Sequence, residues 1–371
     1  MEFLLKSAAI IFNFAISFFY LISIRSHILK RTIPNEISLE KKNGVQKISV
    51  IIPARNEELN IGKILSALLN QTVQPDEIIV INDDSSDKTA KIVETYSRVD
   101  NRVKLVNLKE DPPEDWIGKS WALWNGVHNS DGDLLIFLDA DVEPEKEAIG
   151  ILLSKYNKLG GMISVWPYQR FERFYEHLGF TANLLTVYCS KNFRFRNLKP
   201  AGAFGPVIVT SRKDYFETGG HKVIKNTVLE DLKFGRMYLE NGKNVSNFLG
   251  NGFLKFRMYP GGILQLFEGH TKNMSAGSIT GGVLNFIVAF IWMAGFYSSI
   301  FWMFDSLSHF FVYTGMVLVI YILSKPLGDY SWYDYVFYPL HFLFFLLIFV
   351  VSTFKTLFMR KVSWRGRVIR V

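Results

Sequence analysis

Two aspartates that follow a short apolar run have the spacing of a metal site. The run LLIFL is followed by Asp139 and Asp141, which point to the same side if the run continues as a strand. Two carboxylates in this arrangement can share a hard cation such as Mg²⁺ or its water ligands, and such a cation normally also binds phosphate oxygens. The pattern therefore indicates metal-assisted chemistry on a phosphate-containing ligand.

Two further apolar runs end in polar residues. KISVII is followed by Pro53-Ala54-Arg55-Asn56-Glu57, and EIIVIN is followed by Asp83-Asp84. The sequence contains neither a P-loop nor a GxGxxG fingerprint, so a nucleotide bound here must rely on carboxylates and metal. Each acid taken alone also fits the cap of a following helix, but three acidic strand ends in succession favour a shared site.

The elements that must position these residues alternate between strand and helix. The expected strands are Lys47–Ile52, Glu77–Asn82, Val103–Asn107 and Leu134–Asp139, and the expected helices are Asn60–Leu69, Asp87–Ser97 and Ser120–Val127. Strands that are apolar on both faces and separated by helices indicate a parallel sheet with right-handed crossovers. Ligands of such folds bind outside the carboxyl ends of the strands, where the polar residues lie.

Composition and charge narrow the class of protein. The 371 residues are 49% hydrophobic, which excludes a disordered chain, and the single cysteine excludes a disulfide scaffold. Six of the 42 basic residues lie in Lys355–Val371, which has no acidic residue, and removing those six from the net charge of +8 leaves +2. The excess charge is thus a tail beside an apolar segment, which indicates a membrane bilayer and no nucleic acid partner.

Four stretches without Asp, Glu, Lys or Arg have about the length of a bilayer crossing, roughly 17–25 residues. They are Ser7–Ile24, Ala276–Phe304, Ser306–Ser324 and Tyr335–Phe354. The first is interpreted as an uncleaved anchor rather than a signal peptide, because no small-residue cleavage pattern precedes Arg25. Three long apolar stretches in succession argue against the alternative of buried core helices.

Five motifs in a fixed order resemble those of a known family. IIPARNEE, INDDSSDKT, GKSWALWNG, DGDLLIFLDADV and VLEDL extend from Ile51 to Leu232. In this order they resemble the family 2 glycosyltransferases, which have the GT-A nucleotide-diphospho-sugar transferase fold. The resemblance implies an α/β catalytic domain with a mostly parallel sheet and flanking helices, to which this chain adds transmembrane helices.

The resemblance also implies a role for each matching residue. The nucleotide-sugar would be bound by Pro53, Ala54, Arg55, Glu57, Asp83 and Asp84 around the uridine, by Lys119 near the pyrophosphate and by Asp139 at the ribose. Asp141 would ligate Mg²⁺ or Mn²⁺, the implied cofactor.

The same resemblance makes Asp231 the general base, with Glu230 beside it. Displacing UDP requires charge neutralisation on the leaving phosphate and a carboxylate that takes the acceptor's proton. A single base without an enzyme nucleophile implies inversion of the anomeric centre. An acidic pair at the start of a helix also interacts favourably with the helix dipole, and both roles are compatible.

A narrower resemblance concerns the acceptor. AFGPVIVTSRKDYFETGGHK (Ala203–Lys222), FRMYPGG, EGHTKN and the C-terminal WRGR are similar to the bacterial carotenoid-acid (4,4'-diaponeurosporenoate) glucosyltransferases of the staphyloxanthin type. This implies transfer of a hexose, glucose first, from a UDP-sugar to a membrane-embedded lipid acceptor, a carotenoid acid or a related apolar lipid. Ceramide-like, polyprenyl-phosphate and hopanoid acceptors are alternatives, as is a non-catalytic nucleotide-sugar-binding membrane protein. QLFEGHTKN lacks the Arg-Trp of processive members, so a polymer channel is not expected.

Two histidines lie beside glycines and are candidates for acceptor or phosphate contacts. His221 follows Gly219-Gly220, and His270 precedes Lys272 by two residues. A loop histidine that hydrogen-bonds to backbone is the alternative for His221. The site expected from the sequence therefore includes Gly220, His221, His270 and Lys272 as possible contacts.

The expected organisation is as follows: residues 1–25 form a transmembrane anchor, 26–45 a linker, 46–260 the cytosolic GT-A domain, 261–275 an interfacial segment, 276–354 hydrophobic helices with two or three crossings, and 355–371 a basic tail. Because Arg25, Lys30 and Arg31 follow the anchor, the positive-inside rule predicts a multi-pass protein of the cell membrane with its catalytic domain in the cytoplasm. A cytoplasmic tail requires one apolar stretch not to cross, and Ala276–Phe304 is expected to be that stretch.

Overall fold

The computed structural model describes residues 2–31, 47–193, 198–227, 230–280, 283–354, 361–364 and 367–370. Within residues 2–5, 272–286 and 361–370 only the backbone is described. The chain divides into two compact units. The sheet unit comprises Leu29–Tyr168 and Lys199–Arg257, and the helical unit comprises Met1–Ile28, Gln169–Leu198 and Met258–Val371.

A seven-stranded sheet forms the centre of the sheet unit, with the strand order β3-β2-β1-β4-β8-β6-β9. The strands are β1 (Ile48–Ala54), β2 (Glu77–Asp83), β3 (Val103–Leu108), β4 (Leu134–Leu138), β6 (Met162–Trp166), β8 (Val207–Ser211) and β9 (Val245–Leu249). Only β8 runs antiparallel to its neighbours, β4 and β6, and the other pairs are parallel. The mostly parallel sheet predicted from the apolar runs is confirmed.

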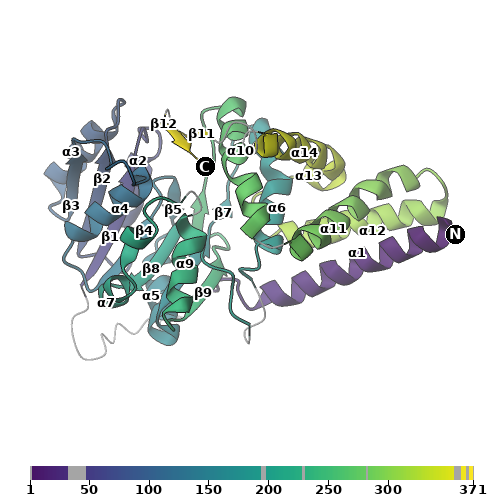
Figure 1. Ribbon diagram of the computed structural model, residues 1–371, viewed down its shortest axis with the longest axis horizontal. Helices are drawn as coiled ribbons and strands as arrows, with labels where there is room; N and C mark the ends of the chain where they lie inside the picture. The colour runs from purple at the N-terminus through teal and green to yellow at the C-terminus, as the bar shows by residue number, and fades with distance from the viewer. Residues whose placement is uncertain are drawn as a thin grey trace. The chain divides into compact units, whose positions relative to one another are not determined.

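Helices cover both faces of this sheet (Figure 1). They are α2 (Ile61–Leu69), α3 (Thr89–Val99), α4 (Gly118–His128), α5 (Ala148–Leu159), α7 (Arg212–Glu217), α8 (Gly220–Val223) and α9 (Glu230–Glu240). Alternate residues of β1 face opposite layers: Val50 and Ile52 lie in one core cluster with residues of α2 and α5, and Ile51 lies in another with residues of α4 and α9. This two-sided burial is the reason why the strands read as continuous apolar runs.

Besides the central sheet, the chain forms a small second sheet. β5 (Val142–Pro144) pairs antiparallel with β10 (Leu254–Phe256), and β7 (Tyr168–Gln169) lies where the chain passes from one unit to the other. The turn between β4 and β5 contains Asp139 and Asp141, so the antiparallel partner of β5 helps to fix the backbone after the aspartates. β5 to β10 were not predicted from the sequence, since these strands are short or lie far along the chain.

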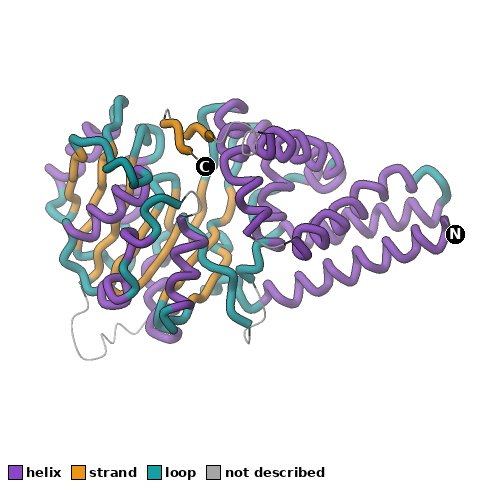
Figure 2. Tube along the Cα trace, in the orientation of Figure 1, coloured by secondary structure: helices purple, strands orange, loops and turns teal. Residues whose placement is uncertain are grey.

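The helical unit contains α1 (Glu2–Arg25), the 3-10 helix η1 (Phe174–Gly179), α6 (Phe180–Cys189), α10 (Ile263–Thr280), α11 (Val283–Trp302), α12 (Leu307–Ser324), α13 (Trp332–Val336), α14 (Tyr338–Phe354) and a hairpin of β11 (Lys361–Trp364) and β12 (Arg367–Arg370). α1, α11 and α12 pack against one another (Figure 2). Asn13 Nδ2 donates to the Trp292 carbonyl at 2.6 Å, and Trp292 Nε1 donates to Ser17 Oγ at 3.0 Å.

Two described helices are long and apolar enough to cross a bilayer, Lys6–Arg25 and Leu307–Ser324. Shorter apolar helices cover Ile287–Trp302 and Tyr338–Phe354. The stretch Ala276–Phe304, which the sequence presents as one apolar run, contains the end of α10 and the whole of α11.

Candidate active site

Lys119 lies among three carboxylates at the carboxyl end of the sheet. Its Nζ is 2.9 Å from Asp139 Oδ1, 3.8 Å from Glu230 Oε1 and 3.9 Å from Asp231 Oδ2. Burial alone would lower the pKa of Lys119, but the charges of Asp139, Asp231 and Glu230 outweigh it and raise that pKa above its ordinary value. Four residues separated by as much as 112 positions in the sequence therefore form one charged cluster, which we call the lysine cluster.

Each member of the lysine cluster is held by local structure. The Asp139 backbone N–H donates to the Pro206 carbonyl at 2.9 Å, which continues the pairing of β4 with β8, and its own carbonyl accepts from Val142 N–H at 3.1 Å. Glu230 and Asp231 occupy the first turn of α9, where acidic side chains are favoured by the helix dipole. Lys119 lies in the first turn of α4, where it needs the carboxylates because a cation is disfavoured there by the same dipole.

Gly205 lies directly against the Asp231 carboxylate. A Cβ atom added at Gly205 would be 1.8 Å from Asp231 Oδ2, so no larger residue fits without moving the carboxylate. Sequence reasoning missed this residue as part of the site. The signal was present in the AFGP motif, but only the packing shows which side chain the glycine admits.

A second charged group lies at the ends of β1 and β2. Arg55 Nη1 donates to the Asp83 carbonyl at 2.6 Å and is 3.7 Å from Asp84 Oδ2. Asp84, which has a φ of 51°, leaves its side chain 73% exposed. Pro53 and Ala54 are the last residues of β1 and lie beside Ile81 and Asn82 of β2. The carboxylate of Asp84 is thus accessible to a ligand, and the guanidinium of Arg55 connects the two strand ends.

Glu57 is almost fully buried and links the loops that follow β1 and β2. Its backbone N–H donates to Thr89 Oγ1 at 2.8 Å, and its Oε2 accepts from Asn60 Nδ2 at 3.0 Å. Asn56, which has a φ of 53°, accepts a hydrogen bond from Ser86 N–H on the other loop. These bonds hold the two loops together, so Glu57 has a structural role in addition to any contact with a nucleotide.

The residues present fit a divalent cation that the ligand helps to coordinate. Asp141 is partly buried in the turn between β4 and β5, and its carboxylate is a hard oxygen donor. Among the described residues, no three His, Cys, Asp or Glu side chains come together as a complete ligand set. Mg²⁺ bound by one or two carboxylates normally takes its other ligands from substrate phosphates and water. A cation at Asp141 would therefore be held jointly by the chain and a diphosphate.

The two histidines lie in different units. His221 is in α8 of the sheet unit, and Lys119 contributes to the electrostatics of its imidazole. His270 is in α10 of the helical unit, 8% exposed, and its Nε2 has no hydrogen-bond partner among the described residues. The Lys272 side chain lies outside the described part of the chain. His221 therefore lies in the same unit as the lysine cluster, and His270 lies in the other unit.

Comparison with known proteins decides the family. The profile for Glycosyl transferase family 2 matches residues 49–219. The 4,4'-diaponeurosporenoate glycosyltransferase of Staphylococcus aureus strain MRSA252 is 35% identical over 335 residues, which are 86% of this chain and 87% of that protein. The protein of the same name from strain bovine RF122 / ET3-1 is 35% identical over 337 residues, 87% of this chain and 88% of that protein. This chain belongs to glycosyl transferase family 2.

A solved structure supports the fold of this glycosyltransferase. The mannosyltransferase PcManGT of Pyrobaculum calidifontis, in complex with GDP-Man and Mn²⁺, superposes with a TM-score of 0.54 at 14% identity. The match covers 96% of this chain and 99% of that one. The GT-A fold predicted from the sequence is thereby confirmed for this glycosyltransferase, and at this identity the likeness concerns the fold alone.

Proposed function

We propose that this glycosyltransferase transfers a hexose, glucose first, from a UDP-sugar to a membrane-embedded lipid, with inversion of the anomeric centre. The observation that carries the proposal is the lysine cluster, which brings one cation and three carboxylates together at the carboxyl end of the sheet. An inverting transfer needs positive charge at the departing diphosphate and a base for the acceptor on the opposite side. The non-catalytic alternative is excluded by membership of a transferase family.

Each charged residue then has a distinct part in the reaction. Arg55, Asp83 and Asp84 hold the nucleoside, and Lys119 moves from its carboxylate partners to the diphosphate when the donor binds. Bound through Asp141, Mg²⁺ or Mn²⁺ supplies charge neutralisation on the departing UDP. Asp231 takes the acceptor's proton, and Gly205 keeps its carboxylate in place. Glu230, which is 7% exposed, provides a second negative charge that holds Lys119 near Asp231.

The acceptor is proposed to be a carotenoid acid or a lipid of similar shape. Relatives that are 35% identical over most of the chain bear the name 4,4'-diaponeurosporenoate glycosyltransferase, and this is the support for an apolar acid. Such an acid has an ordinary pKa of roughly 4, so it is already ionised near neutral pH and attacks without losing a proton. The base is then needed less than with a lipid alcohol.

A membrane location is supported by the helical unit. Large apolar side chains are exposed along three of its helices, among them Ile11 and Phe18 of α1, Phe290 of α11 and Phe311 of α12. Lys6 Nζ is 2.7 Å from Asp305 Oδ2, so the start of α1 lies beside the turn between α11 and α12. We propose that these three helices cross the bilayer together, with Arg25 on the cytoplasmic side.

This arrangement alters the expected topology. The sequence favoured Ala276–Phe304 as the stretch that does not cross, but α11 packs beside α1 and α12, whereas α14 packs on α10, α6 and η1. We therefore propose α14 as the interfacial helix, which leaves the basic tail in the cytoplasm. In a Cys189→Ser background, a cysteine introduced at Val368 should resist a membrane-impermeant thiol reagent in intact cells. Labelling from outside would contradict the topology.

The function is tested with purified protein, a lipid extract and isotopically labelled nucleotide sugars. Mass spectrometry should find label from UDP-glucose in one apolar lipid, and EDTA should abolish the product. Incorporation of label from GDP-mannose alone would overturn the UDP-sugar donor. Addition of the sugar to ceramide, polyprenyl phosphate or hopanoid, with carotenoid acids untouched, would overturn the acceptor.

A further inference from the structure

His221 is buried in an aromatic setting beside the lysine cluster. His221 is 3% exposed, its ring stacks on Phe234 with the ring centroids 4.6 Å apart, and it meets the Phe137 ring at nearly a right angle with the centroids 5.3 Å apart. Burial, which is the larger cause, and the positive charge of Lys119 together lower the pKa of His221 to about 3. The imidazole is therefore neutral near pH 7, and one of its two nitrogens carries a hydrogen.

Tyr215 determines which nitrogen that is. The Tyr215 hydroxyl accepts from the His221 backbone N–H at 3.2 Å and lies 2.9 Å from His221 Nδ1. Burial raises the pKa of Tyr215, so the phenol keeps its single proton. No other acceptor for this proton is found among the described residues, so Tyr215 donates to Nδ1. The hydrogen of the imidazole is then on Nε2.

The two glycines before His221 make this pairing possible. Gly219 has a φ of 88° and Gly220 a φ of 57°, both in the left-handed region that favours glycine. A Cβ atom at Gly220 would be 2.5 Å from ring carbons of Tyr215. Only glycine at position 220 lets the phenol ring lie against the backbone. The motif YFETGGH, from Tyr215 to His221, therefore holds the phenol beside the imidazole.

The Nε2–H group is left without a partner in the described part of the chain. Within the described residues, the His221 side chain forms a hydrogen bond through Nδ1 only, to Tyr215, whose hydroxyl also accepts from the His221 backbone N–H; the His221 carbonyl accepts from Ile224 N–H. Nε2 keeps some exposure to solvent, unlike the fully buried Nε2 of His270, so a ligand can reach it. The positive charge of Lys119, which acts on this imidazole, favours an anionic ligand.

We propose that His221 is a ligand-binding residue whose Nε2–H donates a hydrogen bond to an oxygen of the nucleotide diphosphate, and that Tyr215 is a positioning residue that fixes the tautomer. The inference rests on the proposed function, because that function supplies the diphosphate. The pairing of Tyr215 with His221 can be measured without any ligand. A neutral donor suits this position, since a second cation beside Lys119 would be repelled.

Two near-isosteric substitutions distinguish a contact made by Nε2 from a contact made by Nδ1. The amide nitrogen of glutamine reaches the position of Nε2, whereas that of asparagine reaches only the position of Nδ1. We expect His221→Asn to weaken the binding of Mg²⁺–UDP by about 10-fold, equivalent to about 1.4 kcal/mol, and His221→Gln to weaken it by less than about 3-fold. Tyr215→Phe should weaken binding by about 3- to 10-fold, but should have no further effect in the His221→Gln protein.

The tautomer itself is read from the nitrogen chemical shifts of His221 in protein labelled at histidine, assigned by comparison with His221→Gln. The wild type should show a proton on Nε2 and none on Nδ1, and Tyr215→Phe should show a mixture. Thermal unfolding of each variant confirms that it is folded.

Three results would overturn the proposal: a proton on Nδ1 in the wild type, UDP binding by His221→Asn equal to that of the wild type, or equal losses in the Gln and Asn variants. If the His221 variants bind UDP-glucose more weakly but bind UDP as well as the wild type does, the contact is with the sugar and not with the diphosphate. This result would also overturn the proposal. If the wild type binds GDP and not UDP, the proposed donor is wrong. The same variants then test His221 with GDP, so the two failures are distinguishable.

Discussion

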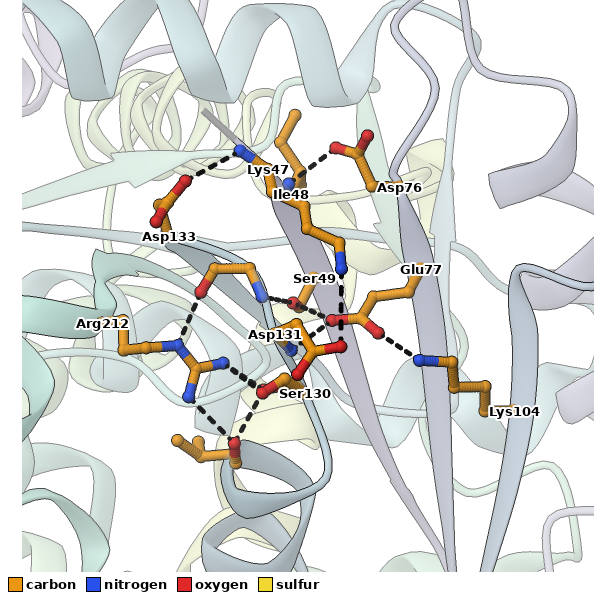
Figure 3. Close-up of polar contacts among 12 residues, drawn as sticks. Lys47, Ile48, Ser49, Asp76, Glu77, Lys104, Ser130, Asp131, Asp133 and Arg212 are labelled. Atoms are coloured by element: carbon orange, nitrogen blue, oxygen red, sulfur yellow. Dashed lines mark hydrogen bonds and ion pairs between the residues drawn. The ribbon is translucent and has the colours of Figure 1, made fainter. Parts of the chain in front are cut away.

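Both ends of the central sheet carry charged side chains, but the charges are satisfied differently. At the amino end of the parallel strands, Glu77 is 2% exposed and accepts from Ser49 Oγ, Asp131 N–H and Lys104 Nζ, each at 2.6 Å (Figure 3). Burial by itself would raise the pKa of Glu77, but these hydrogen bonds outweigh it and lower the pKa to about 2. The negative charge there is paired inside the chain.

Arg212 completes this amino-end network. It donates to the carbonyls of Gly132, Val127 and Ser130 at 2.7, 3.1 and 2.8 Å (Figure 3). These hydrogen bonds connect the end of α4 to the loop before β4. The arrangement satisfies a guanidinium with backbone acceptors, and it requires no ligand.

At the carboxyl end, the charged side chains are partly exposed. The lysine cluster sets one ammonium group against three carboxylates, and Asp84 remains 73% exposed. Partly exposed carboxylates at a sheet end where ligands bind are suited to a cation and a diphosphate arriving together. The comparison teaches that charged side chains alone do not mark a candidate site: Glu77 is buried and hydrogen-bonded within the chain, whereas Asp84 and the lysine cluster leave carboxylates open to a ligand.

The largest effect is expected from Asp141→Asn. This change keeps the size of the side chain and removes the charge that is proposed to hold the cation, so transfer should fall by about 10³-fold or more. The melting temperature should stay unchanged. Asp131→Asn is the matched control at the opposite end of the sheet, where the side chain is 73% exposed, and it should keep its rate. Near-normal turnover of Asp141→Asn would refute the metal role.

Asp231→Asn should separate two kinds of acceptor. With a lipid alcohol, loss of the base should slow transfer by about 10²–10⁴-fold. With a carotenoid acid of similar length, the slowing should be much smaller, because the attacking oxygen is already ionised. Initial rates with both acceptors at saturating UDP-glucose provide the measurement. Equal losses would show that the carboxylate acceptor needs Asp231 as much as the alcohol does.

Gly205→Ala should slow transfer, because it adds one methyl group beside the Asp231 carboxylate. The added methyl group overlaps the Asp231 carboxylate and must displace it, and a misplacement of about 1 Å can cost about 10²-fold in rate. Gly62→Ala in α2 is the control, since its Cβ would meet its nearest neighbour, Ile92, at an ordinary 3.6 Å. Steady-state rates should fall for Gly205→Ala only. A fully active Gly205→Ala enzyme would mean that the position of Asp231 is not critical.

The smallest effect on rate, and the largest on stability, is expected from Glu77→Gln. Unfolding in urea should show a loss of about 1–3 kcal/mol, because buried donors lose a charged acceptor, while the transfer rate of the folded protein stays unchanged. Glu94→Gln on the exposed side of α3 is the control and should unfold like the wild type. A large loss of rate at unchanged stability would assign a catalytic role to the amino end.

Glu77 also predicts a pH dependence. Its folded pKa of about 2 lies below the ordinary value of 4.5, so its contribution to stability is complete above about pH 4.5 and is lost as the pH falls towards 2. In Glu77→Gln this part of the acid dependence of unfolding should be missing. An identical acid profile in both proteins would show that the charge of Glu77 does not contribute.

Much of the sheet unit and the list of site residues follow from the sequence alone. Apolar runs of β-branched residues determine β1 to β4 to within two residues, because strands buried on both faces need continuous apolar side chains. The rule that ligands bind at carboxyl strand ends then selects Arg55, Asp84, Asp139 and Asp141 as candidates, and their roles remain proposals. The strand predictions succeed because each depends on neighbours within a few residues.

The tertiary structure decided what depends on distant partners. It brought Asp139 and Asp231 each within 4 Å of Lys119, set Gly205 against Asp231, and packed α11 against α1. None of these contacts has a local signature, because side chains 20 or more positions apart meet only when the sheet forms and the helices pack. The sequence by itself determined which groups are present and to which strand end they belong; the fold alone determined which of these groups meet, because their partners lie far away along the chain.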